Sequence, residues 1–184
     1  MTDSRAAIDP DLVRRFREGD QEAFGAIFRQ SAQRSYRLAL RITGQPEAAE
    51  DVVQDTFVRL WEARKRVDPN GSVRSFILRI TVNLCLDRFR RLRHETSLEE
   101  DETLLDVAPD HGASDWDAAI DRMAVQEAFE HLPPMYRVTL ALRYGEELSY
   151  QEIAENLGIS VTAVALRILR GKELLRAHFA EKRH

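Results

Sequence analysis

The sequence predicts an all-α fold of two small helical domains joined by an acidic flexible linker, with a helix-turn-helix in the second domain. No stretch shows the sustained apolar–polar alternation of a strand, and apolar residues recur at helical spacing along most of the 184 residues. One acidic segment lacks that spacing. We therefore expect domains at residues 1–94 and 118–184, with the linker at 95–117.

The first domain is expected to open with three short helices, at residues 11–17, 21–30 and 32–42. Gly19 and Asp20 separate the first two, and the third stops near Gly44. The apolar residues of these helices indicate a scaffold.

The next helix, at residues 47–64, is apolar on one side and acidic on the other. The apolar side consists of Ala49, Val53, Phe57, Leu60 and Trp61. The opposite side, here called the acidic stripe, consists of Asp51, Gln54, Asp55, Val58 and Glu62. Such a stripe is either a solvated surface or a docking site for a basic partner.

A loop at residues 66–72, marked by Asp-Pro-Asn-Gly, precedes a long helix at 73–93 that Ser72 caps. We expect this helix to be central to its domain because it is apolar on two sides. One side carries Phe76, Ile77, Ile80 and Leu84, and the other carries Leu78, Val82, Cys85 and Phe89. A narrow polar stripe of Arg79, Asn83, Asp87 and Arg90 runs between them.

Arginines accumulate at the C-terminal end of this helix, namely Arg88, Arg90, Arg91 and Arg93. Positive charge there complements the helix dipole. Four arginines with an aromatic residue among them could also hold phosphates. Cys85 is the only cysteine, so no disulfide can form within the chain, and we expect a buried thiol in a reducing cytosol.

Charge is segregated along the chain. The segment from Glu95 to Asp117 contains nine acidic residues and no Lys or Arg. Since the formal net charge is −4, the rest of the chain carries +5. A negative total therefore does not exclude nucleic acid as a partner.

The second domain is expected to form helices at residues 116–132 and 135–144, with Pro133 and Pro134 as the break between them. Two further helices and a tight turn then occupy residues 148–172. Ser149 and Glu152 form a capping box, and Gly158 ends the first helix of this pair.

Ser160 can cap the second helix of the pair, and small Ala154 allows the two helices to cross closely. Four residues at helical spacing should fill the angle between them: Ile153, Leu157, Val164 and Ile168. This order of features predicts a helix-turn-helix, which either reads DNA or serves as plain core.

Several kinds of chemistry are not indicated. The eight glycines are scattered through turns, the five histidines do not fall at metal-ligand spacing, and no nucleophile with a base can be proposed. Asp51 and Asp55, one turn apart, lack the further ligands that a metal needs. We expect no catalysis, no cofactor, no membrane insertion and no signal peptide.

Four segments, taken in order, resemble bacterial RNA polymerase sigma factors of the extracytoplasmic-function type. They are residues 49–61, residues 76–91, Leu132-Pro-Pro-Met-Tyr-Arg137 and the helix-turn-helix. The resemblance covers about residues 10–94 and 118–178. It implies a sigma factor that binds core polymerase and directs promoter recognition and opening.

The resemblance implies roles for the first domain. The acidic stripe would dock on the coiled coil of the polymerase β′ subunit. The loop at 67–72 would open the minus-ten element and hold the non-template strand, together with Asn70, Arg74, Arg79 and Asn83. Arg88, Arg90, Arg91 and Arg93 would hold phosphates, and the linker would thread through the polymerase as a mimic of nucleic acid.

The second domain would rest on the β flap and read the minus-thirty-five element. The implied DNA-binding residues are Ser160, Thr162, Ala163, Leu166, Arg167, Arg170 and Lys172. A helical wheel points Val161, Val164 and Ile168 inward. Relatives of this type are usually held inactive by an anti-sigma factor between the two domains.

One departure from the family pattern is Ala165-Leu166, where members commonly carry Lys-Ser. Leu166 is thus an apolar residue on the DNA-facing surface. It could meet a thymine methyl, or it could reflect an unusual readout or an occluding partner.

Two other classes of protein compete with the sigma factor. A helix-turn-helix regulator that binds operators without polymerase leaves the acidic stripe and the arginine-rich helix without a purpose. If the chain were a protein-interaction adaptor, the segregated charge would have no purpose.

Overall fold

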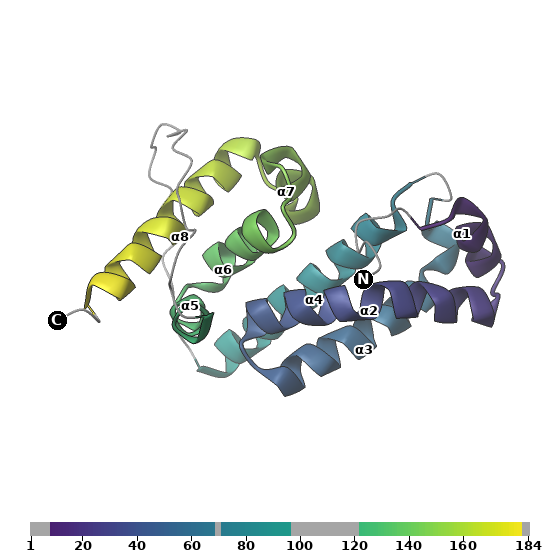
Figure 1. The fold of residues 1–184 in the computed structure, drawn as a ribbon, viewed down its shortest axis with the longest axis horizontal. Coiled ribbons are helices and arrows are strands. Elements are labelled where there is room, and N and C mark those ends of the chain that lie inside the picture. Colours follow the sequence, from purple (N-terminus) through teal and green to yellow (C-terminus); the bar gives the residue numbers. More distant parts are fainter. Residues whose placement is uncertain (1–7, 69–70, 97–121, 182–184) are drawn as a thin grey trace. The chain divides into compact units, whose positions relative to one another are not determined.

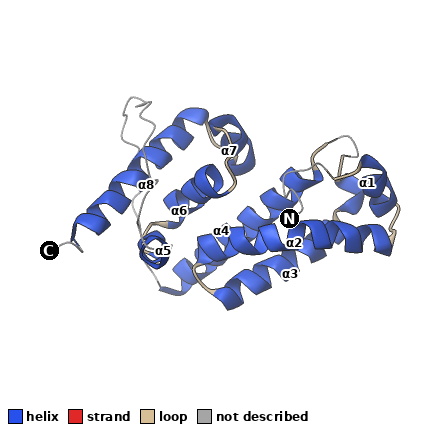
Figure 2. Ribbon diagram, in the orientation of Figure 1, coloured by secondary structure: helices blue, strands red, loops and turns tan. Residues whose placement is uncertain are grey.

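A computed structural model describes residues 8–68, 71–96 and 122–181, without the side chains of 93–96 and 122–125. Every regular element within these ranges is a helix, in agreement with the predicted all-α class (Figure 2). Contacts between Cα atoms divide the chain into two compact units, residues 1–87 and 88–184.

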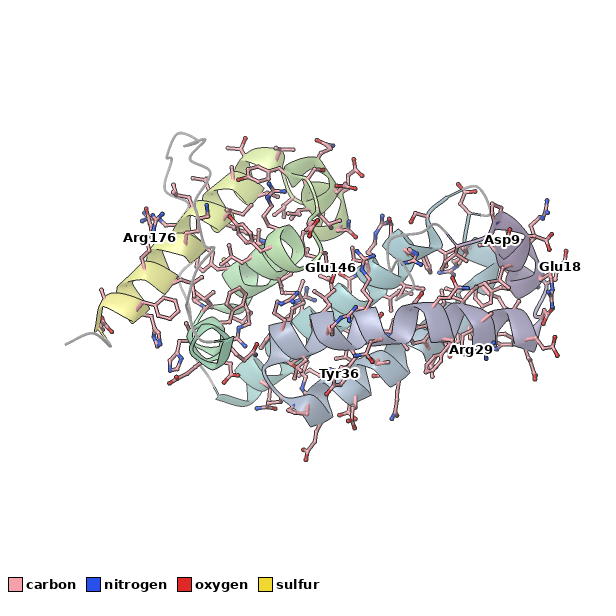
Figure 3. The ribbon with its side chains drawn as sticks, viewed as in Figure 1. Asp9, Glu18, Arg29, Tyr36, Glu146 and Arg176 are labelled. Carbon is pink, nitrogen blue, oxygen red and sulfur yellow. The ribbon has the colours of Figure 1, made fainter. Side chains whose placement is uncertain are left out.

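The first unit begins with α1 (Pro10–Arg17) and α2 (Gln21–Thr43), each capped by an aspartate (Figure 1). Asp9, at the start of α1 in Figure 3, accepts from the backbone N–H of Asp11 at 2.9 Å. Asp20 accepts from the backbone N–H groups of Glu22 and Ala23 at 2.8 and 3.1 Å. The bond from Ala23 and the adjacent Arg15 guanidinium lower the pKa of the Asp20 carboxyl.

Helix α2 corrects one prediction, because it runs without a break through the two helices expected at 21–30 and 32–42. Ser31, at the expected junction, is buried inside the helix, and neither Gly nor Pro is present there to stop it. The helix ends where expected, at Gly44, whose φ of 76° is left-handed.

Helix α3 (Pro46–Glu62), the short 3₁₀ turn η1 (Arg64–Arg66) and α4 (Val73–Thr96) complete the first set of helices. A buried pair of hydroxyls, Thr56 Oγ1 and Thr81 Oγ1, lies 3.3 Å apart between α3 and α4. Each hydroxyl also donates to the backbone carbonyl four residues earlier, so neither buried hydroxyl lacks a hydrogen-bond acceptor.

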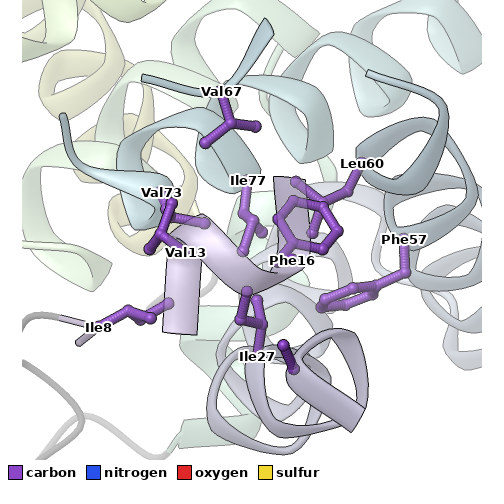
Figure 4. Close-up of a cluster of buried hydrophobic side chains, with 10 residues drawn as sticks. Ile8, Val13, Phe16, Ile27, Phe57, Leu60, Val67, Val73 and Ile77 are labelled. Carbon is purple, nitrogen blue, oxygen red and sulfur yellow. The ribbon is translucent and has the colours of Figure 1, made fainter. Parts of the chain in front are cut away.

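Buried apolar side chains from α1 to α4 form the core shown in Figure 4. Phe16, Ile27 and Leu60 are fully buried, and Val67 extends the cluster beyond η1. Phe24 lies with its ring centroid 5.2 to 6.4 Å from those of Phe16, Phe57 and Trp61, and the centroids of Phe16 and Trp61 are 6.2 Å apart. These contacts fix the face of α3 that turns inward.

Helix α4 continues to Thr96, two residues beyond the predicted end of the first domain at 94, so the first two residues of the predicted linker, Glu95 and Thr96, are helical. The remainder of the predicted linker, residues 97–117, lies outside the described residues.

The second unit contains α5 (Arg122–Glu130), α6 (Pro134–Leu140), the π turn η2 (Ala141–Gly145), α7 (Tyr150–Leu157) and α8 (Val161–Glu181). The helix predicted at 116–132 is seen as α5, and residues 116–121 lie outside the described range. The helix predicted at 135–144 ends in the π turn.

The Arg137 side chain closes the turn between α5 and α6. Its Nη2 donates to the carbonyls of Glu130 and Leu132, the latter at 3.0 Å. Arg137 is buried, and burial lowers the pKa of its guanidinium. One cation thereby satisfies the carbonyl of the last residue of α5 and a carbonyl of the turn that follows it.

Gly171 allows α8 to pass close to α6. A Cβ at this position would lie 2.7 Å from Leu140 Cδ1 and 3.4 Å from Tyr136 Cβ. The crossing therefore requires glycine, although the backbone of α8 is ordinary helix there.

Candidate functional site

The acidic stripe lies along the solvent face of α3. All five of its side chains are exposed. Val58, the one apolar member, is 56% exposed and lies among the polar ones. The opposite face is buried through Ala48, Ala49, Val52, Thr56, Phe57 and Leu60. The predicted inner side was therefore right but incomplete, because it omitted the buried Ala48, Val52 and Thr56, the last of which meets Thr81 of α4.

The polar stripe of α4 is exposed at Arg79, Asn83 and Arg90, and Asp87 is half-buried. Arg91 is exposed, whereas Arg74 and Arg88 are half-buried. Asn70 and the Arg93 side chain lie outside the described residues. On the inner sides of this helix Ile77, Val82, Leu84 and Cys85 are buried, so the expected buried thiol is found.

The helix-turn-helix of α7 and α8 forms as predicted. Ser149 and Glu152 make a reciprocal capping box: the N–H of Ser149 donates to Glu152 Oε2 at 2.8 Å, and the N–H of Glu152 donates to Ser149 Oγ at 3.2 Å. The Ser149 hydroxyl also donates to Glu152 Oε2 at 2.7 Å. The two bonds that the Ser149 hydroxyl and N–H donate to the Glu152 carboxylate lower the pKa of that carboxyl.

The turn between the two helices contains Gly158, with a φ of 67°. Ser160 Oγ then accepts from the N–H of Ala163 at 3.1 Å and starts α8. Ile153, Ala154, Val164 and Ile168 are buried in the angle between the helices, and Leu157 is half-buried. Of the four corner residues chosen from the sequence, three are therefore buried and Leu157 is half-buried.

The outer face of the first turns of α8 carries most of the residues predicted to bind DNA. Thr162 and Arg170 are exposed, and Ala163, Leu166 and Arg167 are half-buried. Val161 was wrongly predicted to point inward. It is 41% exposed because, as the first residue of α8, it has no preceding helical turn against which to pack.

Lys172 does not share this outer face. Its ammonium lies over the Tyr144 ring, 5.6 Å from the centroid, and so turns toward η2. Sequence reasoning missed Tyr144, which is 48% exposed. No local pattern could have linked Tyr144 to Lys172, because η2 and α8 meet only in the folded unit.

The described residues contain no group of three or more His, Cys, Asp or Glu side chains arranged to hold a metal ion. Within the same ranges, no helix is long and apolar enough to cross a membrane.

Comparison with known protein families gives two matches, one in each half of the chain. Residues 27–95 match the model for Sigma-70 region 2, and residues 122–175 match the model for Sigma-70 region 4. The first range includes the acidic stripe and the polar stripe of α4, and the second includes the helix-turn-helix. These matches define the class of protein as sigma-70-type transcription initiation factors.

Individual relatives of known type indicate which kind of sigma factor the chain resembles. The chain is 36% identical to ECF RNA polymerase sigma factor SigE of Mycolicibacterium smegmatis, over 89% of this chain and 65% of the relative. It is 32% identical to ECF RNA polymerase sigma factor SigW of Bacillus subtilis, over 89% of this chain and 92% of the relative. RNA polymerase sigma factor CarQ of Myxococcus xanthus is 33% identical, over 92% of this chain and 96% of the relative.

Two solved structures have similar folds. One is CnrH in complex with the cytosolic domain of CnrY, with a TM-score of 0.67, 27% identity and coverage of 94% of this chain and 97% of that chain. The other is the sigma factor RpoE in complex with the anti-sigma factor NepR from Bartonella quintana. It has a TM-score of 0.66 and 16% identity, and the match covers 85% of this chain and 96% of that chain.

The chain belongs to the extracytoplasmic-function (ECF) sigma factors, the sigma-70-type initiation factors that give core RNA polymerase its promoter specificity. An operator-binding regulator that works without polymerase does not account for the region 2 match.

Proposed function

We propose that the acidic stripe docks this chain on core RNA polymerase, at the coiled coil of the β′ subunit. The observation that carries this proposal is the exposure of all five stripe residues on one face of α3, opposite a fully packed face. Carboxylates steer and orient a basic partner, and Val58 offers apolar surface among them.

The first domain would also hold the opened minus-ten element. Arg79 and Asn83 lie one turn apart on the exposed polar stripe of α4, where they can follow a single strand. Arg74 and Asn70 would contribute from the start of this helix and from the loop before it. Arg88, Arg90, Arg91 and Arg93 would bind backbone phosphates.

The second domain would rest on the β flap and read the minus-thirty-five element with α8. Ser160, Thr162, Ala163, Leu166, Arg167 and Arg170 would face the major groove. Lys172, held toward Tyr144, would bind a flanking phosphate instead of a base.

The proposed organisation is a first domain at 1–94, a linker at 95–117 and a second domain at 118–184. The ranges matched by the two family models support this division. The acidic linker would occupy polymerase surfaces that otherwise bind nucleic acid. The protein would act in the cytoplasm and supply no catalytic group of its own.

An anti-sigma factor is a further proposed partner. The RpoE structure similar in fold to this chain holds the anti-sigma factor NepR, which supports the same kind of regulation here. Such a partner would compete with polymerase or promoter DNA for the surfaces described above.

Run-off transcription tests the proposed function. Purified core polymerase should give a promoter-dependent transcript only when this protein is added. If the protein binds the promoter in the absence of core polymerase, and no transcript forms when core polymerase is present, the protein is instead an operator-binding regulator.

A further inference from the structure

The recognition helix presents an apolar side chain where it should meet base edges. Val164, Ile168, Gly171 and Leu175 form the buried face of α8, and helical spacing places the half-buried Leu166 on the opposite side of the helix. Thr162 and Arg170, one turn before and one turn after Leu166, are both exposed. Leu166 therefore lies at the centre of the outer face, not at its edge.

The outer face also has a boundary beyond Arg170. Arg170 Nη1 pairs with Glu173 Oε2 at 2.8 Å, and both side chains are about half exposed, at 44% and 45%. A carboxylate at this point repels phosphates. The part of α8 suited to enter the groove is thus residues 160–170, about 15 Å at 1.5 Å per residue.

Leucine has no donor or acceptor with which to read a base. Within the major groove, the one apolar group that distinguishes a base pair is the C5 methyl of thymine. Ala163, on the same outer side, likewise offers only a methyl group. Polar readout is left to the flanks of the face, where Thr162, Arg167 and Arg170 carry donors.

We propose that Leu166 is a specificity residue that recognises a thymine methyl in the minus-thirty-five element. This inference rests on the proposed promoter reading by α8 and names the base that its central residue selects. Leu166 would favour thymine through apolar contact, while Arg167 and Arg170 specify neighbouring positions or hold phosphates.

Replacement of thymine by deoxyuridine tests this directly, because it removes the methyl group and keeps the pairing and the polar groups. Holoenzyme assembled from the full chain would first select a promoter from a random DNA library. Each thymine of the upstream element would then be changed to deoxyuridine, and the Kd measured at one fixed salt concentration.

At one or two positions, wild-type holoenzyme should bind the deoxyuridine promoter about fourfold more weakly, the change expected from one buried methyl-sized group of about 0.8 kcal/mol. Leu166→Ala should remove this difference, and Leu166→Met, which keeps an apolar side chain, should retain most of it. Leu174→Ala is the matched control: it alters an exposed leucine of the same helix beyond Glu173 and should leave the difference intact.

Equal sensitivity to deoxyuridine in wild type and Leu166→Ala would overturn the inference, as would a selected element in which no thymine is sensitive. If Leu166→Ala instead weakens only the binding of a protein partner, Leu166 belongs to an occluding interface and not to DNA readout. Failure of the wild-type holoenzyme to select any promoter is a different result, and it would overturn the proposed function itself.

Discussion

At the scale of single residues, the capping box at Ser149 shows most directly how sequence determines local structure. The serine hydroxyl and the Glu152 carboxylate satisfy each other's backbone N–H groups at the start of α7. Two donors that water would otherwise have to solvate are thus held at the entrance of the helix-turn-helix.

Replacement of Ser149 by Ala should destabilise the second domain by about 1 kcal/mol, the usual cost of losing an N-cap. Because the Ser149 bonds lower the pKa of Glu152, their contribution is present above the ordinary value of 4.5 and is lost as pH falls through the lowered pKa. Urea unfolding of both proteins from pH 7 to pH 2 should show curves that converge in acid. Parallel curves would contradict this coupling.

Replacement of two helical glycines by Ala should change the stability of the protein in opposite directions. At Gly171 a Cβ would lie 2.7 Å from buried Leu140, whereas at Gly25 it would meet only the Nη1 end of Arg29, at 3.3 Å. Gly171→Ala should therefore cost about 1–2 kcal/mol through overpacking. Gly25→Ala should instead stabilise the protein by about 0.5–1 kcal/mol through helix propensity.

Differential scanning calorimetry of the two glycine variants checks this pair. A lower Tm for Gly171→Ala and a higher Tm for Gly25→Ala are expected. Stabilisation by both substitutions would mean that α6 and α8 are not held as closely as the geometry at Leu140 requires.

At the scale of elements, the face of each amphipathic helix could be predicted because burial follows the 3.6-residue period. The acidic stripe and the corner of the helix-turn-helix are examples. Continuity at Ser31 and exposure at Val161 were missed although the sequence carries a signal for each: no Gly or Pro stands at residues 30–32, and Val161 directly follows the cap Ser160. The Lys172–Tyr144 contact depends on tertiary packing alone.

The contact between η2 and α8 leads to a prediction about Lys172. Lys172→Ala should weaken binding to promoter variants about equally and reduce the salt dependence of log K by about 1, as expected for one phosphate contact. Tyr144→Leu, which removes the ring under the ammonium, should weaken binding in the same direction, and Tyr144→Phe should largely preserve it. A change in base preference would show that Lys172 reads bases after all.

Arg167 should behave differently from Lys172. It lies half-buried beside Leu166 on α8, and Arg167→Ala should cost about 1–3 kcal/mol and relax specificity at one position if the guanidinium contacts a base. Binding to a panel of single-base promoter variants separates the two outcomes. An effect indistinguishable from zero would remove Arg167 from the readout.

At the scale of the whole molecule, opposite charges are placed on separate surfaces and segments. The exposed face of α3 carries carboxylates, α4 carries arginines toward its end, and the segment from 95 to 117 carries nine acids. A net charge of −4 conceals this separation. The distribution suits a protein that must bind polymerase and nucleic acid at the same time.

Docking of the acidic stripe of α3 on core polymerase is tested most directly by measuring the binding of charge-reversed protein to core polymerase. Asp51→Arg/Asp55→Arg should abolish binding, while circular dichroism shows the helical fold unchanged. Glu50→Arg reverses an exposed charge on the same helix outside the stripe and should bind nearly as well as the unaltered protein. Equal affinity of the double variant and the unaltered chain for core polymerase would show that the acidic stripe does not dock there.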